Sequence, residues 1–312
     1  MSAGKMRPVW SICLVFLALT GVIFAVSALP LDALGELRFE SVAPLVLPSV
    51  ALLHLVYLLL SAEVWRRMVR LVTGARIAFS DAYLQMAAVA VGKYVPGKVW
   101  GFIARVGQLR REQVPAHLTV IGSLIEQILV VAGGAIVIVV SSFLIFPGYH
   151  AVIGVLGILI VAGLVFVSYN IPVIVRWLAR QAVPAEIAED VRFGPLRLLM
   201  FSLAYATLWL LSGVILSIIY YSAFDESVSI QGVAAIILAN TIGFIAGFLA
   251  VFAPGGLGVR EAVTVLVLAP FLPVRELIVA AVALRALIVL FDGINALIML
   301  VGESRHALRN SD

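Results

Sequence analysis

Long apolar stretches separated by short polar segments make up most of the chain. A run of about 20 apolar residues is long enough to cross a hydrocarbon core of about 30 Å as an α-helix. Two apolar regions, near 80–109 and 230–273, are each interrupted by a proline–glycine pair. The pattern therefore predicts an all-α, polytopic membrane helical bundle with two broken, re-entrant hairpins and about six full spans. The predicted spans are 9–29, 45–64, 118–146, 151–175, 198–221 and 277–300.

The composition excludes a soluble protein. Charged residues make up only 12% of the 312 residues, and 63% are hydrophobic. A soluble domain carries about 25% charged residues, because its surface faces water. No polar segment is long enough to fold separately, so we expect one transmembrane domain over 1–312 and no soluble catalytic domain. The net charge of +4 does not indicate nucleic-acid binding, because the lysines and arginines flank the apolar segments.

The first apolar run has two interpretations. Lys5 and Arg7 precede it, and Ala25-Val26-Ser27 loosely resembles the cleavage site of a signal peptide. The apolar core of a signal peptide is usually shorter, about 7–15 residues. The length of the run, 9–29, therefore favours an uncleaved first membrane helix.

Basic residues gather in alternate loops, and basic loops stay on the cytoplasmic side of a membrane. All basic loops fall on the cytoplasmic side if each broken hairpin enters and leaves the membrane on the same side. The first hairpin would then enter from the cytoplasm, and the second from the opposite face. This predicts a protein of the cytoplasmic membrane with both termini in the cytoplasm. The basic positions are Lys5, Arg7, Arg66, Arg67, Arg70, Arg76, Arg110, Arg111, Arg176, Arg180, Arg305 and Arg309.

The order of spans and breaks predicts an inverted repeat, with pseudo-repeat halves of about 1–147 and 148–312. Each half has an odd number of crossings, so the second half would be inserted upside down relative to the first. This plan is typical of transporters, whose sites form where discontinuous helices meet near the midplane. The arm 230–252 is also long enough to cross fully, which leaves its re-entrant character open.

The first break contains the sequence GKYVPGKVW at 92–100. Proline forbids a straight helix, and glycine permits a sharp turn. Backbone groups freed there must be buried in protein or face a wet cavity. Cations around such helix ends suit an anionic phosphate, but the two lysines could instead extend to the cytoplasmic interface. The candidate head-group residues are Lys93, Tyr94, Pro96, Gly97, Lys98 and Arg105.

The second break contains the sequence PGGLGVREA at 254–262, and the next helix is expected to begin at about Val259. A guanidinium beside the free amides of a helix start is suited to a phosphate. Glu261 would complement the positive helix end, and its alternative role is a helix start with a local ion pair. The candidate residues are Pro254, Gly255, Gly256, Gly258, Arg260 and Glu261.

Three further charges, Glu126, Arg285 and Asp292, lie at membrane depth. Intramembrane charges are costly and usually face the bundle interior in pairs. The alternative to a role in binding is a structural pair, Arg285 with Asp292 or Glu126 with Arg105. His54 and Asn240 are expected to make interhelical hydrogen bonds. The scattered histidines and the single cysteine predict no metal site and no cofactor.

The two motifs together resemble the signatures of the lysylphosphatidylglycerol synthase transmembrane region, also called the flippase-like domain family. The resemblance covers essentially the whole chain. It implies a lipid flippase region, which in bifunctional members is joined to a separate cytosolic synthase domain. Since the sequence stops at Asp312, soon after its last span, we expect no synthesis of lysyl lipid.

The leading hypothesis is a non-enzymatic translocase for an anionic or phosphate-linked lipid, either a phospholipid or a polyprenyl-phosphate-linked lipid. The first alternative is a membrane enzyme that acts on lipid-linked envelope precursors, and the second is an accessory scaffold. The partner of the chain could be a second copy of itself, in a homo-oligomer, or an enzyme of envelope biosynthesis.

Overall fold

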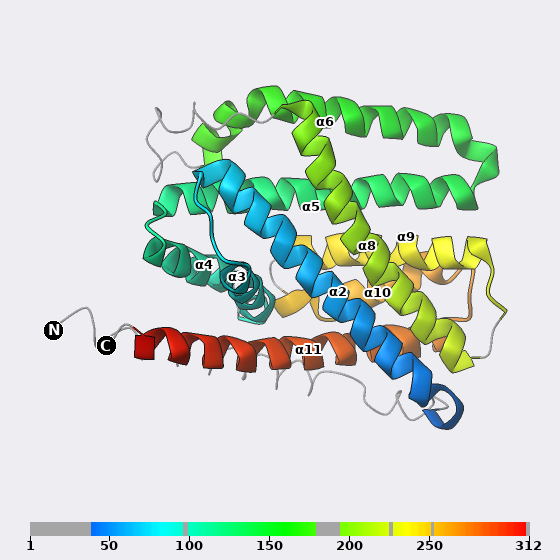
Figure 1. Ribbon diagram of the computed structural model, residues 1–312. Coiled ribbons are helices and arrows are strands. Elements are labelled where there is room, and N and C mark those ends of the chain that lie inside the picture. The colour runs from blue at the N-terminus through cyan, green and yellow to red at the C-terminus, as the bar shows by residue number, and fades with distance from the viewer. Residues whose placement is uncertain (1–38, 96–98, 179–193, 225–226, 251–252, 310–312) are drawn as a thin grey trace.

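The computed structural model describes residues 39–95, 99–178, 194–224, 227–250 and 253–309. These residues contain nine α-helices and no strand (Figure 1). The predicted helical bundle is thus confirmed for this part of the chain. The helices are α2 (Phe39–Thr73), α3 (Phe79–Gly92), α4 (Trp100–Arg111), α5 (Ala116–Ile145), α6 (His150–Leu178), α8 (Pro195–Phe224), α9 (Ile230–Leu249), α10 (Val259–Leu268) and α11 (Val274–Arg309). Short 3₁₀ turns lie at Pro147–Tyr149 and Pro254–Gly256.

Six of the described helices are long and apolar enough to cross a membrane. Five correspond to predicted spans, whereas the predicted span 9–29 lies outside the described residues. The sixth is α9, so the arm that was left open does have the length of a complete span. The candidate spans are Leu45–Thr73, Ala116–Ile145, Pro147–Asn170, Pro195–Phe224, Ile230–Leu249 and Val274–Asn295.

Both broken regions form pairs of helices, as the proline–glycine pairs predict. The first pair, α3 and α4, lies on the side of the C-terminal half of α11, and the second pair, α9 and α10, lies nearer its start (Figure 1). The glycines of the first motif let α3 and α4 approach closely. A Cβ atom at Gly92 would lie 2.7 Å from the Cα of Gly101, closer than real side chains come. Small residues at such contacts are typical of membrane helices.

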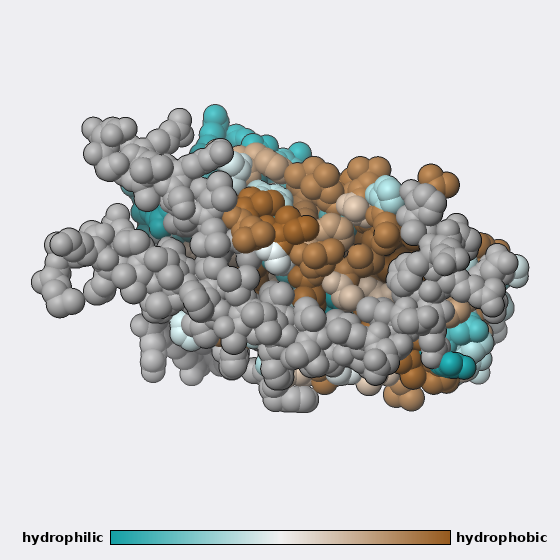
Figure 2. Space-filling model, turned by 90° about the horizontal axis from the view of Figure 1, so that it is seen from below, coloured by the Kyte–Doolittle hydropathy of each residue, from teal (hydrophilic) through white to brown (hydrophobic). Residues whose placement is uncertain are grey.

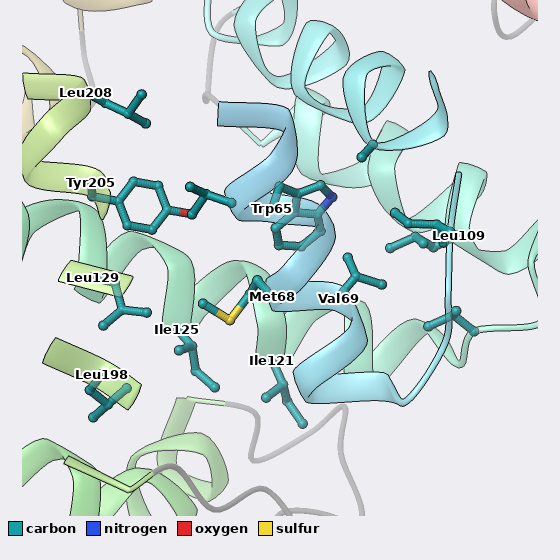
Figure 3. Close-up of a cluster of buried hydrophobic side chains, with 14 residues drawn as sticks. Trp65, Met68, Val69, Leu109, Ile121, Ile125, Leu129, Leu198, Tyr205 and Leu208 are labelled. Atoms are coloured by element: carbon teal, nitrogen blue, oxygen red, sulfur yellow. The ribbon is translucent and has the colours of Figure 1, made fainter. Parts of the chain in front are cut away.

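A buried cluster holds the first hairpin to the long helices (Figure 3). Trp65 and Met68 of α2, Leu109 of α4 and Ile121 of α5 are almost completely buried there. The hairpin therefore has a fixed position in the bundle. Other members shown in Figure 3 are Val69, Ile125, Leu129, Leu198, Tyr205 and Leu208.

The outside of the bundle is apolar over its middle. Figure 2 shows hydrophobic side chains across the centre of one face, with hydrophilic ones toward the ends. Along α6, Ile158 and Phe166 are 68% and 66% exposed. An apolar surface of this extent is costly in water and favourable in lipid. The chain is a multi-pass membrane protein.

Candidate functional site

The two proline–glycine motifs contact one another inside the bundle. The backbone amide of Gly255 donates a hydrogen bond of 2.7 Å to the carbonyl oxygen of Lys93. Gly255 has a φ of +59°, and a Cβ atom there would lie 2.9 Å from Nη2 of Arg285 and 3.0 Å from the Tyr94 ring. Glycine is therefore required both by the backbone conformation and by the crowding. Segments about 160 residues apart in the sequence thus form one site.

Helix α11 supplies the charges that surround this contact. Nη2 of Arg285 donates to the Gly255 carbonyl oxygen at 2.9 Å, and its Nε lies 3.7 Å from a carboxylate oxygen of Glu261. Oδ2 of Asp292 is 2.7 Å from Nζ of Lys93 and accepts a 2.7 Å hydrogen bond from the Tyr94 hydroxyl. The alternative that Arg285 pairs with Asp292 is therefore wrong. Each of these residues instead binds one of the two broken motifs.

Lys93 points to the interior of the bundle. Its partner Asp292 has a side chain only 4% exposed. The side chain of Lys93 is itself 30% exposed, but its ammonium group binds a buried carboxylate, which favours a place inside the bundle over one at the membrane interface. Pro96, Gly97 and Lys98 lie outside the described residues, and their assignment to the site stays a prediction.

Arg260 is a buried cation on the first turn of α10. The residue is 5% exposed, and its guanidinium lies 3.7 Å from the centre of the Phe244 ring. Its Nη2 donates to Oδ1 of Asn240 at 3.2 Å, and Nδ2 of Asn240 donates to the Ser212 hydroxyl at 3.1 Å. Asn240 thus makes the interhelical hydrogen bond expected from the sequence. Among the described residues, no carboxylate forms an ion pair within 4.0 Å of Arg260.

Glu261 starts α10 as the sequence predicts. The helix begins at Val259, and the backbone amide of Gly258 donates to the Glu261 carboxylate at 2.8 Å. This satisfies one of the amides that a helix start leaves without a partner. Gly255, Gly256 and Gly258 all have positive φ. The loop after Pro254 therefore turns tightly, and Arg260 contacts α9 whereas Glu261 pairs with Arg285 of α11.

Residues of α8, α9, α10 and α11 line a small, partly open pocket of about 10 Å³. This is room for about one water molecule. Two arginines and one glutamate line the cavity, so the fixed charges on its wall sum to +1. The lining residues are Leu216, Asn240, Arg260, Glu261, Thr264, Ala281, Leu284 and Arg285. The pocket is thus too small for a phosphate group, and its wall carries a net positive charge.

Arg105 lies in a different cluster, at the first hairpin. Its Nη1 donates to a Glu126 carboxylate oxygen at 2.6 Å and to the Ser123 hydroxyl at 3.2 Å. Its guanidinium lies 3.6 Å from the centre of the Trp65 ring, and the Tyr205 hydroxyl donates to Glu126 at 3.2 Å. The Glu126–Arg105 alternative is confirmed. The structure gives Arg105 no contact with Lys93, Arg260 or Arg285 among the interactions of the described residues.

Sequence reasoning missed the aromatic supports of both arginines. Trp65 and Phe244 each lie within an apolar helix, where an aromatic residue is typical of ordinary packing. Nothing in their spacing distinguishes a ring that carries a guanidinium from one that fills the core. Cation–π contacts of this kind stabilise a desolvated guanidinium by about 2 kcal/mol.

The fold and site define a multi-pass helical membrane protein with a buried, charged centre between two broken hairpins. The model of the family described as lysylphosphatidylglycerol synthase TM region matches residues 9–294. The chain belongs to this family, whose membrane region is associated with lipid handling. No curated protein matches the chain.

Proposed function

We propose that the protein translocates a lipid with an anionic, phosphate-bearing head group across the cytoplasmic membrane and leaves it chemically unchanged. The observation that carries this proposal is Arg260, a buried guanidinium with an amide and an aromatic ring as its partners. A buried charge without a counter-charge is costly. A phosphate oxygen would supply that counter-charge and match the planar fork of donors that arginine presents.

The neighbouring cations, Arg285 and Lys93, would also neutralise the head group once the site rearranges. Arg285 lines the same cavity, and its ion pair with Glu261 is long, at 3.7 Å. Lys93 belongs to the first hairpin, and its ammonium group binds Asp292 beside the contact between the two motifs. Moving a phosphate through hydrocarbon without such groups is costly. Cations from both hairpins would thus take the place of the water that normally solvates the head group.

Translocation requires the site to open, because a cavity of about 10 Å³ holds no phosphate group. The hydrogen bond from Gly255 to Lys93 joins the two hairpins, so it is the contact that opening must break. The acyl or prenyl tails would stay in the bilayer beside the apolar outer surface. The closed conformation would then be an intermediate between two open ones.

The packing of the helices supports the inverted repeat and the proposed orientation. Helix α3 packs against α11 and α2, and its proposed counterpart α9 packs against α5 and α8. Helix α4 packs against α5, as α10 packs against α11. The C-terminal ends of α2, α4 and α11, which carry basic residues, lie at one end of the bundle (Figure 1). That end would face the cytoplasm.

The test follows the movement of an anionic phospholipid between leaflets of liposomes that contain the purified protein. Replacing Arg260 with Gln removes a charge-assisted interaction of about 1.5–3 kcal/mol, so we expect a loss in rate of roughly tenfold to a hundredfold. The matched control is Arg67→Gln, which changes an exposed arginine at one end of α2.

Arg67→Gln should translocate at the wild-type rate. Equal rates for wild type and Arg260→Gln, both above protein-free liposomes, would contradict the proposal. Mass spectrometry of the lipid afterwards separates translocation from catalysis, because a translocase returns the lipid unmodified. A new lipid product that depends on the protein would support a membrane enzyme instead.

A further inference from the structure

The charged residues buried in the described part of the bundle do not balance. Three of them are arginines and two are carboxylates, so one positive charge is in excess. Two partly exposed residues, Lys93 and Glu261, pair with members of this set and leave the excess unchanged. The five buried residues are Arg105, Glu126, Arg260, Arg285 and Asp292.

His54 is also buried but does not change this balance, because histidine is uncharged at pH 8. Its Nε2 has no hydrogen-bond partner among the described residues, so the expected interhelical hydrogen bond is wrong for this nitrogen. The ring instead stacks on Phe291 of α11, with centroids 4.3 Å apart. The excess positive charge therefore belongs to the arginines.

The excess lies at the pocket that Arg260 and Arg285 line. Arg105 is paired with Glu126 at 2.6 Å, whereas Arg260 has no carboxylate within 4.0 Å in the described part of the chain. Arg285 is only loosely paired, at 3.7 Å from Glu261, and its buried Nε makes no hydrogen bond to a described residue. Glu261 is the one carboxylate among the residues that line the pocket. Its single negative charge thus sets the net charge of the wall.

We propose that Glu261 selects the charge of the head group, so that the site accepts a phosphodiester with one negative charge and rejects phosphate groups with two. One negative charge neutralises both the pocket wall and the buried charges of the described bundle. A second one would leave a net negative charge inside the membrane, which is costly. It would also lie beside the Glu261 carboxylate, and like charges repel strongly in a medium of low dielectric constant.

The proposal distinguishes two classes of phosphate-linked lipid, and it rests on the proposed function because it names the substrate class of the same site. A phosphodiester with an uncharged substituent carries one negative charge. A phosphate monoester has a second pKa of about 6 and carries close to two charges at pH 8. Specificity often comes from a group that repels the wrong ligand as well as from one that binds the right ligand. Arg260 would attract the phosphate, and Glu261 would repel a second charge.

The experiment compares two lipids that differ by one methyl group: phosphatidylmethanol, a phosphodiester, and phosphatidic acid, a phosphate monoester. Both carry the same fluorescent acyl chain, and a reductant added at pH 8 quenches the label in the outer leaflet of the liposomes. For the wild type, we expect phosphatidylmethanol to move at least about tenfold faster than phosphatidic acid. In Glu261→Gln the pocket wall gains a positive charge, so phosphatidic acid should move about tenfold faster than in the wild type.

The variant and its control preserve the helix starts. Glutamine has the shape of glutamate, and its carbonyl oxygen can still accept the hydrogen bond from the Gly258 amide that starts α10. The matched control is Glu276→Gln, in the first turn of α11. Glu276 accepts a hydrogen bond from the Tyr220 hydroxyl and does not line the pocket. We expect this control to keep the wild-type preference for phosphatidylmethanol.

The outcomes separate the two proposals. In the wild type alone, equal rates for the two lipids or a faster rate for phosphatidic acid would overturn the charge selection. An undiminished preference for phosphatidylmethanol in Glu261→Gln would overturn the role of Glu261. The proposed function would survive either result if Arg260→Gln still slowed phosphatidylmethanol. If neither lipid moved faster than in protein-free liposomes, translocation itself would be contradicted.

Discussion

Two buried arginines, one at each broken hairpin, have similar aromatic supports and opposite electrostatic surroundings. Arg105 lies 3.6 Å from the centre of the Trp65 ring, and Arg260 lies 3.7 Å from the centre of the Phe244 ring. Arg105 has a carboxylate partner at 2.6 Å in Glu126. Arg260 has the neutral amide of Asn240 in the corresponding role. The comparison distinguishes an arginine that holds helices together from one that, in our proposal, takes its counter-charge from the lipid head group.

The first of these residues, Arg105, holds three helices together. Arg105 and Glu126 join α4 to α5, and the Tyr205 hydroxyl brings in α8. The side chain of Arg105 is completely buried, so water cannot replace a lost partner. This region should therefore respond to mutation through stability, whereas the Arg260 region should respond through transport.

The largest effect is expected for Glu126→Gln. The substitution leaves the guanidinium of Arg105 buried without a counter-charge, which typically costs about 3–5 kcal/mol. The free energy of unfolding should fall by that amount in a denaturant titration of the protein in detergent. Arg260→Gln is the comparison variant and should lower stability less, because the lost contacts with Phe244 and Asn240 are offset by removal of a buried charge that has no carboxylate. A larger loss of unfolding free energy for Arg260→Gln than for Glu126→Gln would contradict the structural role assigned to the Arg105–Glu126 pair.

A smaller effect is expected for Tyr205→Phe. The change removes one hydrogen bond to Glu126 and keeps the aromatic ring in the cluster of Figure 3. Such a bond contributes about 0.5–1.5 kcal/mol. The same titration should show a decrease of this size, and translocation should proceed at the wild-type rate. Loss of translocation without loss of stability would show that the Arg105 cluster takes part in transport directly.

The sequence predicts the helical architecture well because hydrophobic length and proline–glycine breaks act locally. The start of α10 at Val259 and the two halves of the first hairpin follow from such local signals. The Glu126–Arg105 pair was one of the alternatives that the sequence offered, but the pair of Lys93 with Asp292 was not. Lys93 and Asp292 meet only because the tip of the first hairpin reaches α11, and nothing near either residue in the sequence encodes that contact.

The role of Arg260 illustrates the same limit. Its position beside a helix start indicated a phosphate site, but the absence of a carboxylate partner depends on which helices surround it. Phe244 and Asn240 of α9 could be assigned to Arg260 only once the packing of α9 on α10 was known. The predicted span 9–29 and the residues Pro96, Gly97 and Lys98 lie outside the described residues and remain predictions.

The most direct test gives Arg260 a carboxylate partner, as Arg105 has in Glu126. Asn240→Asp is nearly isosteric and places a carboxylate beside Arg260, where Oδ1 now lies 3.2 Å from Nη2. With its counter-charge built in, Arg260 should no longer attract a phosphate. We predict that anionic lipid moves at least about tenfold more slowly in liposomes with this variant, while the protein stays as stable as the wild type. Movement at the wild-type rate would contradict the claim that the missing counter-charge of Arg260 binds the lipid head group.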